Sequence, residues 1–355
     1  MALSGFASVV DSSFSKTVDG AVFPLVVQSS GSEGSGDLAA ALEWVAANTE
    51  QIAEQLRQSG TILFRGFPLK TAEDFDAFVC AFQGYEDLSY EDSLSFAVRV
   101  QKSNRICTTN EGRTGGLVFH HEQAQSPRWP SKLFFCCAKA AEPGDGGQTG
   151  VCRSDEVLRA LEAHDPAFVA KCVALGVKYT IYMSEASDAS KGVGRSWKSY
   201  FSAKDVGECE ARMAALGYTW EWGEGGILTA TTPRLEAVTT APGTDKRCFF
   251  NQLPATTNNA IEFSRVGKDG SGLEGGADSD TPTQEGLDRC LSFGDGSQVS
   301  LETLLYAKEL CEQHAVDLPW QDGDVALIDN YIVMHARRIW SGPLGSRQLL
   351  ASLVA

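Results

Sequence analysis

Apolar runs of strand length, separated by turn-forming segments, are the feature of this sequence that most constrains its fold. We interpret KLFFCCAKA (132–140) as a buried strand, and DVALIDNYIVMHA (324–336) and RQLLASLVA (347–355) as a closing pair of buried strands. A further strand-like run, GGLVFHHE (115–122), is separated from the first by the turn-prone SPRWPS. These runs favour a core that is mainly β.

Helical periodicity is also present, and it predicts helices around that core. The segment 38–56 has apolar residues at helical spacing, follows a capping residue in Asp37, and is followed by a Gly60 that can end it. Further helices are predicted over 71–82, 154–165 and 301–315, and TILFRGF (61–67) between the first two reads as a buried strand.

We find no internal repeat and no convincing linker, so the sequence predicts a single domain over residues 1–355. Residues 185–300 are rich in Gly, Thr, Ser and Asp. We expect this insertion to form a lid or a binding loop, with a plain flexible loop as the alternative.

The charge of the chain limits its partners. Its 355 residues include 30 basic and 46 acidic side chains, a formal net charge of −16. Such a surface repels phosphate backbones and anionic lipids, so we expect no nucleic-acid or membrane partner. Any anionic ligand must therefore be bound by a local basic pocket, and the sequence leaves the oligomeric state open.

The N-terminal residues and the cysteines point to a cytoplasmic protein. No basic residue precedes Lys16, and Asp11 already lies within the first segment, unlike a secretory signal. Its serine content leaves an organelle transit peptide as an alternative, weakened by the lack of Arg. The ten cysteines show no paired CxxC spacing, so we expect reduced, mostly buried thiols.

Histidine is scarce, and two of the five histidines lie beside a carboxylate in His120-His121-Glu122. On a strand, His120 and Glu122 project from the same face while His121 faces away. With His335 as a third ligand, they would make the two-histidine, one-carboxylate site of non-haem Fe(II) oxygenases, which leaves positions open for O2. The residues alone leave two alternatives, a hydrogen-bonded core histidine and a Glu122 paired with Arg128.

Several motifs, in order, show a more specific similarity. From about Gly60 to its end, the sequence resembles the taurine dioxygenase and TfdA-like Fe(II)/2-oxoglutarate oxygenases, most closely the clavaminate synthase-like branch. The motifs are LFRGFP (63–68), FHHEQAQSPRWPSKLFFCC (119–137), GGQT (146–149), GRSWKSYF (194–201), PWQDGDVALIDNYIVMHARR (319–338) and RQLLASL (347–353).

The resemblance implies a double-stranded β-helix, or jelly roll, with flanking helices, and an enzyme that uses Fe(II), 2-oxoglutarate and O2. It implies that His120, Glu122 and His335 hold the iron, Glu being the carboxylate used in this branch. Thr149 matches a residue that binds a carboxylate of 2-oxoglutarate, and Arg347 matches the arginine that fixes its far carboxylate. Many relatives carry a second arginine four residues later, where this chain has Ala351.

The reaction implied is oxidation of an unactivated C–H bond in secondary metabolism, by hydroxylation, oxidative cyclisation or desaturation. We expect a small carboxylate-bearing substrate, such as an amino acid or a derivative, bound by Arg195 and Lys198 of the lid and by Asn110. The first two could equally form a solvated lid face, and Asn110 could cap a turn. The alternatives in function are a zinc hydrolase with the same ligands and a non-catalytic jelly-roll binding protein.

Overall fold

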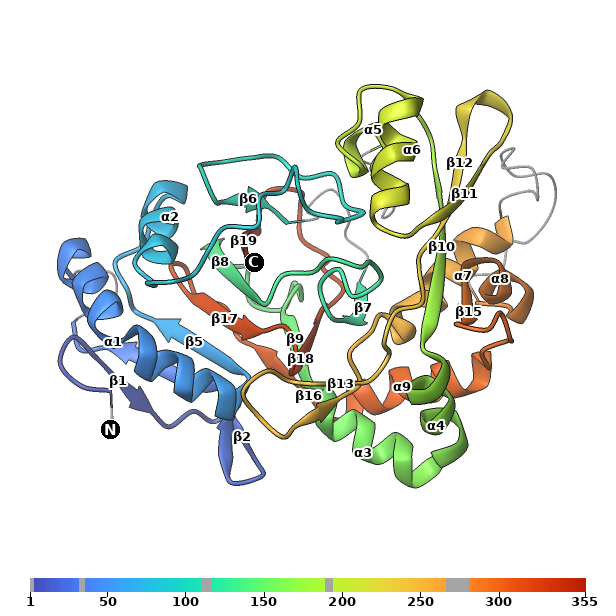
Figure 1. Cartoon of the computed structure of the whole chain (residues 1–355). Coiled ribbons are helices and arrows are strands. Elements are labelled where there is room, and N and C mark those ends of the chain that lie inside the picture. Colours follow the sequence, from blue (N-terminus) through green and yellow to red (C-terminus); the bar gives the residue numbers. More distant parts are fainter. Residues whose placement is uncertain (1–2, 32–35, 110–115, 189–193, 266–280) are drawn as a thin grey trace.

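The computed structural model describes residues 3–31, 36–109, 116–188, 194–265 and 281–355. In this part of the chain, two sheets form the centre of a mixed α/β fold (Figure 1). The larger sheet has the order β1 (Ala7–Val10), β4 (Leu25–Ser29), β5 (Thr61–Arg65), β17 (Val325–Asp329), β8 (Lys132–Lys139), β19 (Gln348–Val354) and β6 (Cys107–Thr108). The smaller has the order β16 (Ala315–Leu318), β9 (Thr149–Arg153), β18 (Val333–Arg337) and β7 (Leu117–His120).

The two sheets pack against each other through one apolar core. Phe135 and Ile328 of the larger sheet share this core with Val151 and Val333 of the smaller one. Because side chains alternate along a strand, Phe134, next to Phe135 in β8, faces the opposite side and packs beneath the helices. Strand β8 is therefore buried on both faces, which explains its unbroken apolar run.

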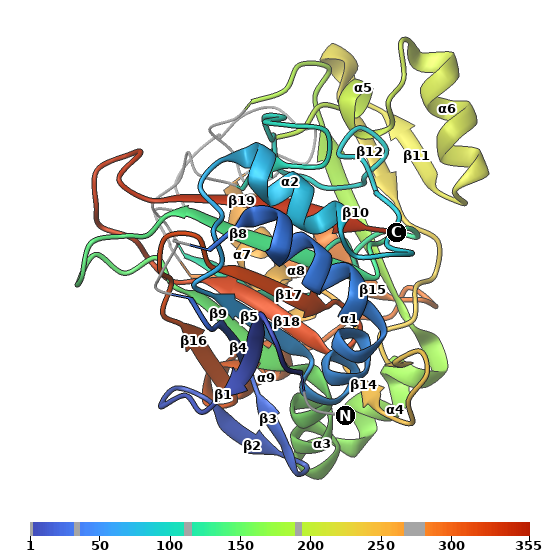
Figure 2. The same ribbon diagram turned by 90° about the vertical axis from the view of Figure 1, so that its left-hand side faces the viewer.

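Helices cover the two outer faces of this pair of sheets. Helices α1 (Leu38–Ser59) and α2 (Ala72–Cys80) lie over the larger sheet, as Figure 2 shows. The smaller sheet packs against α7 (Leu253–Arg265) and α9 (Leu301–Gln313), and the same apolar core includes α3 (Ser154–His164), α4 (Pro166–Leu175) and α8 (Gln284–Cys290). The predicted ends of the first helix are confirmed, since Asp37 caps α1 and Gly60 ends it at a φ of 79°.

The described part of the 185–300 insertion is built from regular elements. A third sheet, in which three strands of the insertion join β10 from just before it, has the order β11 (Thr219–Trp222), β12 (Leu228–Thr231), β10 (Val177–Met183) and β15 (Leu291–Phe293). It packs with α5 (Trp197–Tyr200) and α6 (Val206–Ala215). Two small hairpins complete the strands of the described chain, namely β2 (Lys16–Val18) with β3 (Ala21–Phe23), and β13 (Thr239–Thr240) with β14 (Arg247–Cys248).

The prediction of one long strand over 324–336 was wrong. The run contains β17 and β18, which lie in different sheets, and β17 pairs with β5 and β8 rather than with the closing strand β19. The carboxylate of Asp329 accepts a hydrogen bond from the backbone N–H of Tyr331, at 2.9 Å. This local turn reverses the chain between the sheets inside an otherwise apolar run.

The expectation of free thiols is confirmed, because all ten cysteines are free and all but Cys80 are buried. No helix within the described ranges is long and apolar enough to cross a membrane.

Candidate active site

Strands β7 and β18 bring the two distant histidines together. His120 and His335 are direct partners in this antiparallel pair, and their ring centroids lie 4.3 Å apart. Nδ1 of His120 lies 2.8 Å from the carbonyl oxygen of Val118, which can only accept. Nδ1 of the neutral ring therefore carries the hydrogen, and Nε2 is left as a lone-pair donor.

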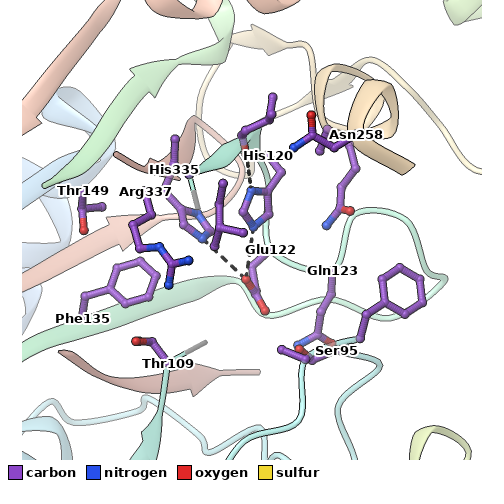
Figure 3. Close-up of a pocket in the computed structure, with 18 of the residues that line it drawn as sticks. Ser95, Thr109, His120, Glu122, Gln123, Phe135, Thr149, Asn258, His335 and Arg337 are labelled. Carbon is purple, nitrogen blue, oxygen red and sulfur yellow. Dashed lines mark hydrogen bonds and ion pairs between the residues drawn. The ribbon is translucent and has the colours of Figure 1, made fainter. Parts of the chain in front are cut away.

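Glu122 completes the cluster from a turn rather than from the strand. Strand β7 ends at His120, so the prediction that Glu122 lies on the same strand was wrong. Its Oε2 still lies 3.8 Å from Nε2 of His120 and 3.6 Å from Nε2 of His335 (Figure 3). His121 points away, as expected, and its ring contacts that of Phe250.

Asn330 holds the turn that carries Glu122, and sequence reasoning had not singled it out. Its side-chain oxygen accepts from the backbone N–H of Glu122 at 2.8 Å, and its amide nitrogen donates to the Glu122 carbonyl at 3.0 Å. The same nitrogen donates to the Pro130 carbonyl at 2.8 Å. Because Asn330 lies between β17 and β18, it couples the turn to the strand that carries His335.

Arg99 binds the second oxygen of the Glu122 carboxylate. Its Nη2 donates to Oε1 at 3.0 Å, and both side chains are only 8% exposed. Glu122 thus forms a buried ion pair with Arg99, 23 residues earlier in the chain, in place of the alternative pairing with Arg128. The other oxygen, Oε2, faces the two histidines and is the one that a metal ion between them would contact.

Electrostatics keep Glu122 and His335 in the forms that bind metal. Burial alone would raise the pKa of Glu122, but the charge of Arg99 holds it well below its usual value. Burial, helped by the charge of His120, lowers the pKa of His335 to about 4. A carboxylate and a neutral imidazole are therefore present at neutral pH.

These residues fit a divalent metal ion. All three ligand atoms lie within 4.8 Å of one another, and the two carboxylate–imidazole distances are shorter than the roughly 4.2 Å spanned by two metal–ligand bonds. Two imidazoles and one carboxylate also suit Fe(II) with open positions.

The two residues expected to bind 2-oxoglutarate, Thr149 and Arg347, line the same cavity as the triad. They are 4% and 5% exposed, and they come from different sheets, at the start of β9 and just before β19. The stem of Arg347 lies against Gly147, where an added Cβ would lie 2.8 Å from its Cδ. Gly147 also has a φ of 74°, so both conformation and space favour glycine there.

Two of the residues predicted to bind substrate, Arg195 and Lys198, lie outside the described lining of this cavity. Arg195 is 4% exposed, its Nη1 and Nη2 donate to the carbonyls of Ser93 and Ser199, and it lines a neighbouring cavity. Lys198 forms an ion pair with Glu185 at 2.7 Å. Neither belongs to the described lining of the triad cavity, and Asn110 lies outside the described residues.

Other residues that sequence reasoning missed do line the cavity. Arg337 follows His335 by two positions in β18, and it points toward the same space because alternate residues of a strand share a face. Gln123 and Gln125 belong to the turn that begins at Glu122. Figure 3 places Thr149 and Arg337 on one side of the triad, and Gln123, Ser95 and Asn258 on the other. Arg337 could have been found from its i+2 spacing to a proposed ligand.

Comparisons with known proteins agree with this site. Residues 22–352 match the model of the taurine catabolism dioxygenase TauD, TfdA family. A clavaminate synthase-like protein of Arabidopsis thaliana is 34% identical over 300 residues, which cover 84% of this chain and 82% of the relative. The dapdiamide synthesis protein DdaC of Enterobacter agglomerans is 25% identical over 302 residues, covering 84% of each chain.

Among solved structures, the PvcB protein of Pseudomonas aeruginosa is similar in fold, with a TM-score of 0.50, 12% identity, and coverage of 98% of this chain and 90% of that one. The chain belongs to the TauD/TfdA family. It is therefore a dioxygenase that depends on Fe(II) and 2-oxoglutarate, and the predictions of enzyme class and cofactors are confirmed.

Proposed function

We propose that this enzyme oxidises an unactivated C–H bond of a small substrate that carries a carboxylate, such as an amino acid or a derivative. Hydroxylation is the simplest outcome, and cyclisation or desaturation at the same site are variants of it. The observation that carries the proposal is the charge of the triad cavity. Its described lining contains three arginines, Arg99, Arg337 and Arg347, but a single carboxylate, that of Glu122.

The charge balance favours an anionic substrate. Fe(II) and the dianion of 2-oxoglutarate cancel each other, so binding both leaves the excess of positive charge in the cavity unchanged. Arg99 is already paired with Glu122. The net charge of the whole chain is −16, yet several arginines line this one buried cavity. Their positive charge favours binding of an anion there.

Each residue has an assigned role in this proposal. His120, Glu122 and His335 hold the iron, which with O2 supplies the oxidant for the C–H bond when bound. Arg347 and Thr149 bind the carboxylates of 2-oxoglutarate, Arg347 because its planar fork can donate two parallel hydrogen bonds to one carboxylate. Arg337 is then the partner that we assign to the substrate carboxylate.

The surrounding chain shapes the site. The ring of Phe135 packs on that of His335 with centroids 5.0 Å apart. Ala255 and Asn258 of α7, inside the 185–300 insertion, line the cavity from another side. The cavity volume of about 250 Å³ lies just below the range of roughly 300–1,000 Å³ for ligand sites, which favours a small substrate.

The same observations support the proposed architecture. The shared core of the two central sheets favours a jelly roll within a single domain, with the insertion acting as a lid. The contribution of α7 to the cavity supports this role for part of the insertion.

A panel of amino acids, organic acids and their uncharged amides or esters tests the proposal through substrate-stimulated succinate release. We expect turnover with carboxylates, and a Michaelis constant for the carboxylate raised roughly tenfold or more in Arg337→Gln. Turnover with uncharged compounds only would refute it. Anaerobic addition of Fe(II) and 2-oxoglutarate, followed by the visible charge-transfer absorbance of the chelate, shows separately that the cofactors bind.

A further inference from the structure

The turn that follows the iron ligand Glu122 carries two glutamines into the triad cavity. Gln123 and Gln125 are 1% and 3% exposed, and both line this cavity. Gln123 has a φ of 58°, a left-handed conformation that costs free energy for a residue with a side chain. Such strain is retained mainly where the surrounding structure needs that side chain in place.

One backbone residue, Leu94, fixes the orientation of both side-chain amides. The backbone N–H of Leu94 donates to Oε1 of Gln123 at 2.9 Å, so the amide oxygen must be the atom on that side. The carbonyl of Leu94 accepts from Nε2 of Gln125 at 3.1 Å, so here the amide nitrogen must be on that side. The N–H and the carbonyl of Leu94 thus determine which atom of each side-chain amide forms no hydrogen bond with Leu94.

The two remaining amide atoms are complementary. Nε2 of Gln123 is a donor and Oε1 of Gln125 is an acceptor, and both are buried without a hydrogen-bond partner among the described residues. A buried polar atom without a partner costs roughly 1–3 kcal/mol, so such atoms call for a ligand or a water molecule. The two atoms provide one donor and one acceptor, which is the complement of an amide group.

We infer that Gln123 and Gln125 recognise an amide group of the substrate, with Gln123 donating to its carbonyl oxygen and Gln125 accepting from its N–H. This inference rests on the proposed function and deepens it. The substrate then carries a carboxylate on the Arg337 side of the iron and a carboxamide or peptide-like amide on the Gln123 side, which lies opposite in Figure 3. The C–H bond to be oxidised lies between the two groups.

Matched compounds test the inference without altering the protein. N-acetyl amino acids contain an amide, the corresponding O-acetyl hydroxy acids replace its N–H by an ester oxygen, and free amino acids have neither group. We expect succinate release with the N-acetyl compounds, and a kcat/KM lower by roughly tenfold or more for the esters, because a site that donates and accepts rejects a partner lacking one group. Primary carboxamides such as glutamine and asparagine distinguish a side-chain amide from a peptide-like one.

A variant of reversed polarity gives a second test. Gln123→Glu retains the oxygen that accepts from Leu94 and replaces the donor by an acceptor, so we expect the preference for amides over esters to fall at least several-fold. The matched control is Gln101→Glu, since Gln101 is exposed, lies outside the triad cavity, and donates to the carbonyl of Ser103. Thermal unfolding of each variant shows that it is folded.

The outcomes separate the two proposals. Equal rates with amides and esters in the wild type, or an unchanged preference in folded Gln123→Glu, would overturn the inference and leave the glutamines as water-binding groups. The wider proposal would survive in that case, provided that carboxylates still stimulate succinate release. If no carboxylate does so while Fe(II) and 2-oxoglutarate form their chelate, the proposed function itself fails.

Discussion

The indole N–H of Trp320 donates to the hydroxyl oxygen of Thr149 at 3.0 Å. An indole nitrogen can only donate, so the hydroxyl must accept from it and must direct its own hydrogen elsewhere. Thr149 lines the triad cavity, whereas Trp320 lies behind it in a neighbouring cavity. Trp320 therefore leaves the Thr149 hydroxyl as a donor, which is the role we propose for it toward a carboxylate of 2-oxoglutarate.

Replacing Trp320 by Phe should weaken 2-oxoglutarate binding without removing any group that touches it. Loss of one orienting hydrogen bond is worth about 0.5–1.5 kcal/mol, so we expect the dissociation constant to rise by roughly two- to tenfold. Anaerobic titration of the Fe(II) protein, followed by the chelate absorbance, measures this directly. Thr149→Val should cause a loss at least as large, and an unchanged dissociation constant in Trp320→Phe would show that the hydroxyl is oriented without the indole.

Gly147 should be required for the position of Arg347. A methyl group at Gly147 would lie 2.8 Å from Cδ of Arg347, so Gly147→Ala should displace the guanidinium and raise the Michaelis constant for 2-oxoglutarate roughly tenfold or more. Gly144→Ala is the matched control. Gly144 also has a positive φ, of 97°, but an added Cβ there would meet nothing within 4 Å.

Both substitutions place an alanine at a positive φ, at a backbone cost of about 1 kcal/mol, so the control separates that cost from the contact with Arg347, and only Gly147→Ala should change cosubstrate binding. Equal Michaelis constants in the two variants would mean that Arg347 adjusts to the added methyl.

Removing Arg99 should destabilise the metal-free protein. Arg99 and Glu122 form a buried pair, and taking away one partner leaves an uncompensated carboxylate, at a cost of about 3–5 kcal/mol. We therefore expect a large drop in the free energy of unfolding of Arg99→Gln, measured by urea denaturation in the presence of a chelator. Arg128→Gln, an exposed arginine near the same turn, should stay within about 0.5 kcal/mol of the wild type. A stable Arg99→Gln would contradict the role of the pair.

Local pattern predicted much of the fold and singled out the three residues of the triad, but not the contacts that position them. Helix caps such as Asp37 and Gly60 are visible in the sequence because they depend on neighbouring residues. The hydrogen bonds from Asn330 to the backbone of Glu122, and the Arg99–Glu122 pair, join segments far apart in the chain, so no short pattern reveals them.

The hydrogen bonds of Arg195 could not be read from the sequence for a related reason. A lone arginine in a lid-like segment has the same sequence signature whether it binds a substrate or, as here, the carbonyls of Ser93 and Ser199.

Tyr85 should make the stability of the fold depend on alkaline pH. Its ring stacks on Phe82, with centroids 5.3 Å apart, and its hydroxyl is buried without a hydrogen-bond partner among the described residues. Burial, and then the charge of Asp329, raise the pKa of Tyr85 from 10 to about 12. The unfolded chain thus loses this proton at a lower pH than the folded protein does.

The part of the free energy of unfolding that depends on the protonation of Tyr85 is therefore fully present below pH 10. It is lost as the pH rises from 10 toward 12, by at most about 1.4 kcal/mol per pH unit. Tyr85→Phe should remove this dependence and also stabilise the protein at neutral pH by about 1 kcal/mol, because it deletes an unpaired buried hydroxyl. Urea unfolding of both proteins at pH 8 to 11 measures the difference between their free energies of unfolding. The effects of other titrating groups are the same in both proteins and cancel in this difference.

Tyr90→Phe is the opposite case, since the Tyr90 hydroxyl donates to the Ala97 carbonyl at 2.6 Å and its loss should destabilise the protein. Equal effects of the two substitutions at neutral pH would mean that the Tyr85 hydroxyl does form a hydrogen bond, for example to a bound water molecule.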